Sequence, residues 1–269
     1  MRRAVDLNRR ADAAPQPERA RDVDTDLPGL DRWRPLAEDC VSLCIQKPKT
    51  DVELRRISEL WNGRRDVELQ LWGYAVQDLE FLRYFSGLER FNVQVPIVRN
   101  IDGLRHVEDS LKEFTLASTT VRLSLHPVAR CARLESLHLQ RQVKDFGALR
   151  SLTGLRYLGI SGVSLPDLSP LVTFEQLRSL FLGFCKPIDL SLLGRFTDLE
   201  ALHIIKMNKL RDLSALRLGL NAITASVSAW IPIRRDAPVS FTLTGRPARL
   251  RYRRRAHHEQ REMVQRAAR

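Results

Sequence analysis

The chain has 269 residues, a formal net charge of +12 and 43% hydrophobic residues. This apolar content is sufficient for a folded core and argues against a mostly disordered protein. No apolar run approaches the ~20 residues of a membrane span, and no apolar stretch of signal-peptide length follows the basic first residues. We therefore expect neither a membrane span nor a secretory signal.

The cysteines are too few and too scattered for a disulfide framework: Cys40, Cys44, Cys131 and Cys185. Reduced thiols and a cytoplasmic location are the simplest interpretation. Cys40 and Cys44 have no histidine nearby, whereas a metal site there would need a second pair of ligands. We expect no metal and no other cofactor.

Residues 1–32 are rich in Arg, Asp, Ala and Pro and have almost no periodic apolar pattern. Such a composition buries too little apolar surface to offset the entropy lost on ordering, so we predict a flexible leader. Residues 33–65 differ. Within them, residues 41–45 alternate apolar and small side chains, which predicts a strand that ends before Pro48.

A helix is predicted after this strand, because Thr50 and Glu53 have the spacing of a capping box. One helical face would contain the apolar residues Val52, Ile57, Leu60 and Trp61, and the helix would end at Asn62 and Gly63. Residues 33–65 therefore predict a strand-and-helix N-terminal cap, which the exposed end of a stacked array requires.

The strongest pattern is a motif of the form L-x-x-L-x-L, with Ile as the last residue in two copies. Its four clear copies begin 21, 22 and 22 residues apart, at Leu134, Leu155, Leu177 and Leu199. A second motif recurs between them and reads Asp-Leu-Ser-Pro-Leu at residues 167–171. A fixed period of roughly 20–29 residues with this motif predicts a solenoid, because stacking buries an apolar edge that one unit cannot bury alone.

Weaker copies extend the array in both directions. Two copies with Phe in the second position begin at Leu88 and Leu111, and a further step back reaches residue 66. A step of 21 residues beyond Leu199 predicts a last copy with Ile223 and Ala225 as its inward strand residues. We therefore assign residues 66–226 to the repeats and predict about eight parallel strands.

Residues 134–216 resemble the 22-residue leucine-rich repeats of bacterial internalins and of eukaryotic phosphatase-regulator subunits. The motif at residues 167–171 is close to the typical descending turn of that subclass. The resemblance implies a curved α/β solenoid with a parallel sheet on the concave side and loops or short helical turns on the convex side. Together with the Arg- and Ala-rich composition it favours a bacterial source.

One feature departs from this family. Its members usually have Asn at the ninth position of each repeat, where the side chain bonds neighbouring backbone groups. Here that position holds Pro96, Thr119, Gln142, Val163, Cys185 and Met207, of which only Cys is a common substitute. We therefore expect a less regular solenoid.

The repeat pattern ends near residue 226. Residues 227–248 contain two apolar segments compatible with strands and a Gly-Arg-Pro turn, which predicts a candidate C-terminal cap. Residues 249–269 form an Arg-rich tail. From residue 229 to 269 there are eleven Arg against three acidic residues, so 11 − 3 = +8 of the net charge lies there. This abrupt change in composition is also compatible with a shifted reading frame.

Motifs of enzymes are absent from the sequence: there is no Gly-rich phosphate loop, no Gly-x-Ser-x-Gly, no His-Glu-x-x-His and no Cys-x-x-Cys. His138 and His203 both face outward on predicted strands. They lie three repeats, or roughly 14 Å, apart, which is too far for one metal ion or one proton relay. We therefore predict a protein without enzymatic activity.

The outward strand positions are the best candidate site. Side chains alternate along a strand, so the residues between the buried leucines face the concave surface. Exposed aromatic side chains on a rigid sheet are typical of interface hot spots, although these could instead pack against one another or under the C-terminal segment. The candidate protein-binding residues are His138, Tyr157, Phe181, His203 and Ile205.

We predict a scaffold that binds a protein partner through this face. The alternative is a nucleic-acid-associated adaptor, in which the tail neutralises phosphates through Arg249, Arg251, Arg253, Arg254 and Arg255. Only Tyr252 lies among them as a stacking residue, which argues against sequence-specific recognition, and a solvated tail without this role is a further alternative. A small enzyme would need a pocket with a perturbed ionisable group, and the outward positions offer none.

Overall fold

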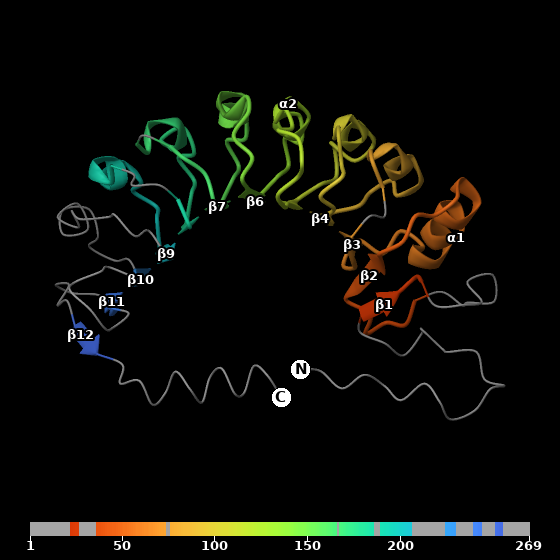
Figure 1. Ribbon diagram of the computed structural model, residues 1–269, viewed down its shortest axis with the longest axis horizontal. Coiled ribbons are helices and arrows are strands. Elements are labelled where there is room, and N and C mark those ends of the chain that lie inside the picture. The colour runs from red at the N-terminus through yellow and green to blue at the C-terminus, as the bar shows by residue number, and fades with distance from the viewer. Residues whose placement is uncertain are drawn as a thin grey trace.

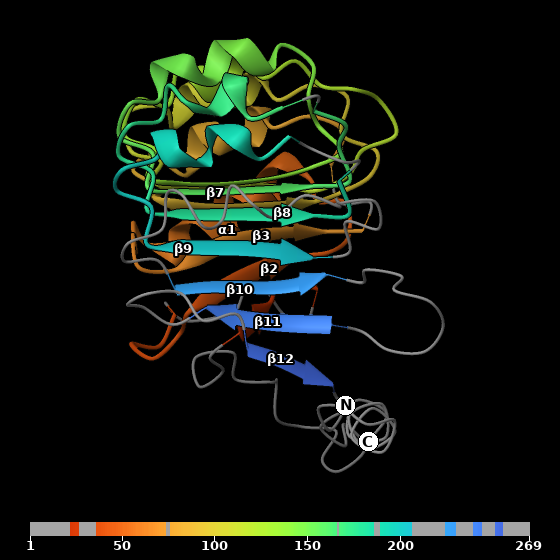
Figure 2. The same cartoon turned by 90° about the vertical axis from the view of Figure 1, so that its left-hand side faces the viewer.

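The computed structural model describes residues 22–26, 36–73, 76–165, 167–185 and 189–205, together with the backbone of three strands between residues 224 and 254. The described strands form one sheet in chain order, from β1 to β12. Every pairing from β1–β2 to β9–β10 is parallel, whereas β11 is antiparallel to both of its neighbours, as Figure 2 shows. The sheet lines the inner side of an arc, and short helical turns lie on its outer side (Figure 1).

The strands are β1 Asp22–Asp24, β2 Ser42–Ile45, β3 Glu68–Trp72, β4 Arg90–Gln94, β5 Glu113–Leu116, β6 Ser136–Gln140, β7 Tyr157–Ser161, β8 Ser179–Gly183, β9 Ala201–Ile205, β10 Thr224–Ala229, β11 Val239–Leu243 and β12 Arg251–Arg254. The α-helices are α1 Asp51–Trp61 and α2 His126–Ala129. The 3-10 turns are η3 Glu80–Tyr84, η4 Asp102–His106, η5 Phe146–Ser151, η6 Ser169–Leu171 and η7 Ser191–Arg195.

The L-x-x-L-x-L motif places its leucines in the core. Leu158 pairs in register with Leu137 on one side and Leu180 on the other, and all three are fully buried. Each repeat therefore stacks its apolar residues directly on those of the next, which produces one continuous core along the arc. The predicted solenoid, its concave parallel sheet and its strand-and-helix cap are confirmed, and β3 to β10 are the eight predicted repeat strands.

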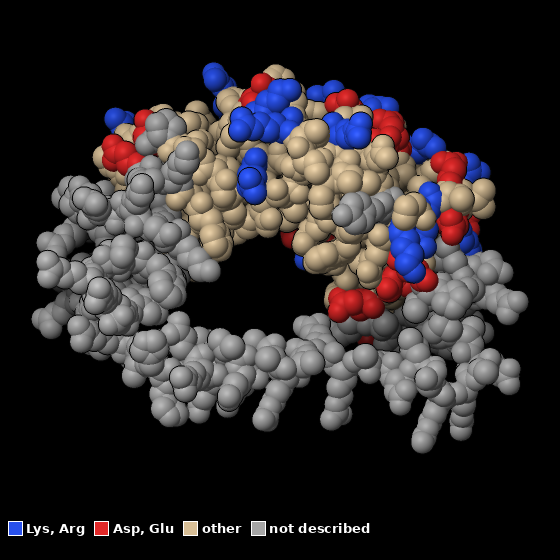
Figure 3. All heavy atoms as spheres, in the orientation of Figure 1, with Lys and Arg blue, Asp and Glu red and all other residues tan. Residues whose placement is uncertain are grey.

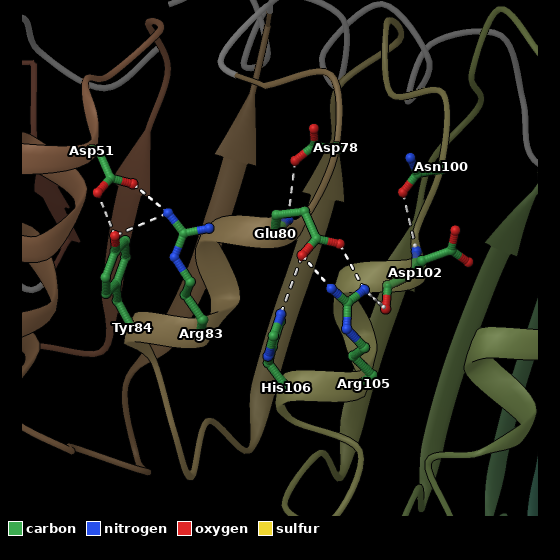
Figure 4. Close-up of polar contacts among 9 residues, drawn as sticks. All are labelled: Asp51, Asp78, Glu80, Arg83, Tyr84, Asn100, Asp102, Arg105 and His106. Atoms are coloured by element: carbon green, nitrogen blue, oxygen red, sulfur yellow. Dashed lines mark hydrogen bonds and ion pairs between the residues drawn. The ribbon is translucent and has the colours of Figure 1, made fainter.

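The recurring Asp-Leu-Ser motif initiates the 3-10 turns of the convex side. The carboxylates of Asp167 and Asp189 each accept a hydrogen bond of 2.8 Å from the backbone amide two residues later. Asp78 and Asn100 do the same before η3 and η4, at 3.0 and 3.2 Å (Figure 4). The side chain satisfies an amide that has no partner within the turn, which explains why Asp or Asn recurs there.

Ion pairs join neighbouring turns on the convex side (Figure 4). Asp51 of α1 accepts hydrogen bonds from Arg83, at 2.6 Å, and from Tyr84 of η3. Glu80 of η3 accepts two from Arg105 of η4, at 2.6 and 2.7 Å. Solvent screens exposed pairs of this kind, so they fix the relative orientation of adjacent repeats more than they stabilise the core.

Helix α1 has the predicted ends but not the predicted buried face. The side chain of Thr50 accepts a hydrogen bond from the Glu53 amide, and the side chain of Glu53 accepts one from the Thr50 amide. The C-cap residue Asn62 has a left-handed backbone conformation. However, Val52 is 78% exposed, and Leu54 is buried with the other three predicted residues. The prediction for Val52 was wrong because Leu54 lies three residues before Ile57, whereas Val52 lies five before it and so on another side of the helix.

The described part of the predicted flexible leader forms strand β1, which differs from the expectation. Its only apolar residue, Val23, is 1% exposed. Contacts from residues distant in sequence hold the aspartates around it: Ser42 donates to Asp22 at 2.8 Å, and Lys49 pairs with Asp26 at 2.6 Å. Pairing with the edge of β2 therefore orders a segment whose own sequence has no strand pattern.

The last parallel strand is displaced from its predicted position. Ala225 of β10 pairs with Leu202, the site predicted for Ile223, so the repeat step here is two residues longer than expected. An even shift preserves the inward and outward faces of a strand. Strand β11 lies within the predicted cap at residues 227–248, and β12 lies within the predicted tail.

Gln142 occupies the ninth position of its repeat, where the related repeats usually have Asn, and its side chain also bonds neighbouring groups. It is 1% exposed, donates to the Thr119 hydroxyl at 2.7 Å and accepts from the Leu123 amide at 3.2 Å. At the same position two repeats later, the Cys185 thiol donates to the Gly183 carbonyl at 3.3 Å. Gln142 thus satisfies a loop amide and Cys185 bonds a strand carbonyl, and the strand pairing continues without interruption.

Candidate functional site

The candidate residues of the concave face come from strands β6 to β9 and are all half-buried: His138, Tyr157, Phe181, His203 and Ile205. The register places them in three outward columns, as predicted. Ser136 is opposite Tyr157, and the central column runs from His138 through Gly159 and Phe181 to His203. In the outer column, Gly183 pairs with Ile205.

Three of these side chains form one cluster, because Gly159 leaves room for them. A Cβ atom on Gly159 would lie 2.6 Å from Nδ1 of His138 and 3.0 Å from the hydroxyl of Tyr157. Both side chains therefore lean over the glycine. The ring of His138 also contacts that of Phe181, with centroids 5.6 Å apart and planes inclined at 39°.

Gly183 has the same role beside Phe181. Its Cβ would lie 2.7 Å from the Phe181 ring and 3.4 Å from the Ser161 hydroxyl. That hydroxyl lies 3.2 Å from Nε2 of His138, within hydrogen-bond distance. We call His138, Tyr157 and Phe181, lying over Gly159 and Gly183, the aromatic platform. The rings of His138 and Phe181 contact each other, the Tyr157 hydroxyl approaches Gly159, and all three side chains leave part of their surface open on the concave side.

The aromatic platform is partly shielded from solvent. Burial lowers the pKa of His138 and raises the pKa of Tyr157, because it disfavours the charged form of each group. Both side chains are therefore neutral at physiological pH. The platform presents an uncharged, half-buried surface with the Tyr157 hydroxyl and His138 as its polar groups.

The lowered pKa of His138 predicts a pH dependence of stability. The unfolded chain binds the proton more readily than the folded chain, so the contribution of His138 is complete above the unfolded pKa of about 6.5 and is lost as pH falls below it. Urea unfolding of the wild type and of His138→Gln should show the wild type losing stability relative to the variant between about pH 7.5 and 5.5. A difference that is constant across this range would contradict the burial of neutral His138.

His203 and Ile205 flank the platform on strand β9. His203 pairs with Phe181, and Ile205 pairs with Gly183, so both extend the platform by one strand. His138 and His203 are three strands apart, as predicted. Within the described ranges no three His, Cys, Asp or Glu side chains gather in a way that could hold a metal ion.

Phe184 is a surface residue that the sequence analysis missed. It follows strand β8, its side chain is 58% exposed and its φ is +53°. Arg141 and Gly162 follow the two preceding strands with similar positive φ values, +58° and +65°. A bulky residue in this left-handed conformation costs about 1–2 kcal/mol relative to Gly, so the aromatic side chain next to the platform is maintained against strain. The sequence does contain a signal for it, because Phe184 aligns with Gly162 of the preceding repeat and so occupies a position that favours glycine.

For the alternative nucleic-acid site, the structure describes at most the backbone. Arg251, Arg253 and Arg254 belong to the backbone of β12, and Arg249 and Arg255 lie outside the described residues. Binding of nucleic acid by these arginines stays a prediction. As for membranes, the described helices include none that is long and apolar enough to cross a bilayer.

Comparisons with solved structures identify the fold. Internalin C2 of Listeria monocytogenes matches over 66% of this chain and 84% of its own, with 22% identity and a TM-score of 0.50. A second Listeria monocytogenes internalin matches over 75% and 59%, with 20% identity and a TM-score of 0.52. A leucine-rich repeat protein of Leptospira interrogans matches over 81% and 57%, with 13% identity and a TM-score of 0.50. The chain thus spans less than two thirds of the latter two structures.

No protein-family model and no curated protein matches the sequence. The low sequence identity of the structural matches limits the comparison to the fold. The concave sheet, the convex turns and the L-x-x-L-x-L register are those of a leucine-rich repeat solenoid.

Proposed function

We propose that this leucine-rich repeat protein is a scaffold that binds a protein partner on its concave face. The observation behind the proposal is the aromatic platform, where three large side chains are held over two glycines on a rigid sheet. Binding would extend over His203 and Ile205 on one side and Phe184 at the edge. In this proposal the protein has no enzymatic activity and works in the cytoplasm, where its four free thiols would remain reduced.

The energetic basis of the proposal is preorganisation. The His138–Phe181 contact and the approach of Tyr157 to Gly159 already restrict these rings, so a partner would lose little side-chain entropy on contacting them. Large aromatic side chains with one polar group are the usual hot spots of protein interfaces. The Tyr157 hydroxyl would add a hydrogen bond at the edge of an otherwise apolar contact.

A capture experiment tests this site. The full chain and a Tyr157→Ala/Phe181→Ala variant are used as bait in extracts of the source cell, after circular dichroism has shown that both are folded. If each of the two side chains contributes about 2 kcal/mol to binding, the double variant should bind its partner at least about 100-fold more weakly. The partner should then be absent from the captured proteins. The matched control is Thr173→Ala/Gln176→Ala, at two exposed positions outside the strands, which should leave the set unchanged.

A protein partner retained by the folded double variant would exclude the aromatic platform as the site. Captured material that is mainly RNA or DNA, and that is lost steeply as salt increases, would instead favour the adaptor alternative through the Arg-rich tail. The two outcomes differ both in the class of molecule captured and in their response to salt.

A further inference from the structure

The N-terminal end of the concave face is acidic, although the whole chain is strongly basic. Asp24 on β1 and Glu68 on β3 lie at outward positions, and their described partners are neutral amides. Gln46 donates to Asp24 at 3.0 Å, and Gln70 donates to Glu68 at 2.5 Å. Figure 3 shows acidic atoms gathered at this inner end of the arc, over β1 and β2.

The pKa of a thiol on β2, between these strands, is raised by burial and by nearby carboxylates. Burial, followed by the carboxylates of Asp24, Asp26 and Asp22, raises the pKa of Cys44 to about 12. Cys44 pairs with Asp24 on one side and with Gln70 on the other, so it lies in the middle of this end of the sheet. The carboxylates that raise this pKa belong to β1 and the turn after it, and Glu68 adds a further carboxylate on β3.

An exposed tryptophan accompanies the carboxylates. Trp72 at the end of β3 is 39% exposed, and its indole N–H donates to the Gln70 side chain at 3.1 Å. Because Gln70 in turn donates to Glu68, one hydrogen-bonded chain along β3 orients the tryptophan and the carboxylate together. A Trp ring beside carboxylates suits a Lys or Arg side chain, through cation–π and ionic contacts.

The outward positions of strands β1 to β3, which the structure describes, contain no lysine or arginine. Arg90 is the one Lys or Arg at an outward position of the described strands β1 to β9, and it pairs with Glu113 at 3.1 Å. Towards the other end, the outward positions of β6 to β9 contain no carboxylate, lysine or arginine. The concave face thus has an acidic end at β1–β3 and the uncharged aromatic platform at β6–β8.

We infer that the partner is a basic segment, whose Lys or Arg side chains contact Asp24, Glu68 and Trp72 and whose apolar side chain contacts the aromatic platform. This inference rests on the proposed function and specifies the chemistry of the partner. From β3 to β8 there are five strand spacings, or about 24 Å, which an extended segment spans in about seven residues. The charge complementarity also steers the partner onto the face.

Three labelled synthetic peptides test the inference by fluorescence anisotropy with the full chain at low salt. The first has four lysines, a Gly-Ser spacer of about eight residues and one tryptophan, so that it spans both ends of the face. The second has four glutamates instead of the lysines, and the third has alanine instead of the tryptophan. We expect the first to bind at least about tenfold more tightly than the other two.

Two charge variants of the protein locate the contact. Asp24→Asn/Glu68→Gln should weaken binding of the first peptide about tenfold. Asp109→Asn/Glu175→Gln removes the same charge from exposed positions outside the sheet and should change it less than about twofold. The Tyr157→Ala/Phe181→Ala variant should bind the first peptide only as tightly as the wild-type protein binds the third.

Equal or tighter binding of the glutamate peptide, no binding of any peptide, or equal effects of the two charge variants would overturn the inference. Self-association of the chain that depends on Asp24 and Glu68 would assign the acidic end to a second copy and would also overturn it. In each of these cases the capture experiment with Tyr157→Ala/Phe181→Ala remains a separate test, so failure of the basic-partner inference is distinguishable from failure of the proposed function.

Discussion

Gly103→Ala is expected to lower the free energy of unfolding by about 3 kcal/mol or more. Gly103 lies in η4, where its Cβ would be 2.1 Å from the carbonyl oxygen and 2.2 Å from the carbonyl carbon of Leu79. These are backbone atoms, so no rotamer change relieves the contact. The turns η3 and η4 would have to separate, which disturbs the stacking of two repeats. Urea unfolding followed by circular dichroism measures the loss.

Gly194→Ala is the matched control for this prediction. Gly194 also lies in a 3-10 turn, η7, but its Cβ would have no atom within 4 Å. We expect a change within about 1 kcal/mol, and in the stabilising direction, because alanine reduces the entropy of the unfolded chain. Equal losses in the two variants would show that the close packing of η3 on η4 is not the cause.

Phe114→Ala is expected to cost about 3–5 kcal/mol. Phe114 is 1% exposed and stacks on Phe91 of the preceding repeat, with ring centroids 5.9 Å apart and planes inclined at 26°. Removing the ring leaves a cavity between two repeats and deprives Phe91 of its partner. Chemical unfolding of the full chain measures the effect.

The control for Phe114 uses the regular repeats. Phe114 pairs in register with Leu137, so leucine already fits this inward position one strand later. Phe114→Leu should therefore cost less than about 1.5 kcal/mol. If leucine proved as costly as alanine, the ring stacking rather than the filled volume would determine the stability of this part of the core.

The repeat register could be predicted from the sequence because it is a local and periodic property. Leucines spaced as in Leu134, Leu137 and Leu139 must face one core, and the alternation of a strand then fixes which residues face outward. The same logic identified Tyr157 and Phe181 as outward residues. It could not determine how their side chains lie, which depends on the room above Gly159 and Gly183.

The errors at strands β1 and β10 arose where long-range contacts or loop lengths decide the structure. Strand β1 is an aspartate-rich segment ordered by β2, Ser42 and Lys49, none of which its own sequence reveals. Strand β10 is two residues later than expected because the step from Leu202 to Ala225 is 225 − 202 = 23 residues, whereas the prediction used a step of 21. Phe184 was overlooked because the prediction followed the leucines and not the left-handed position that follows β6, β7 and β8.

The most direct test of the central claim is photocrosslinking from defined positions of the folded protein in the source cell. A benzophenone amino acid replaces Ser179, which pairs with Tyr157 on the concave face, or Thr173, which is exposed outside the strands. The proposal predicts a protein adduct from position 179 and none from position 173. An adduct from position 173 alone, or the same adducts from both positions, would contradict binding on the concave face.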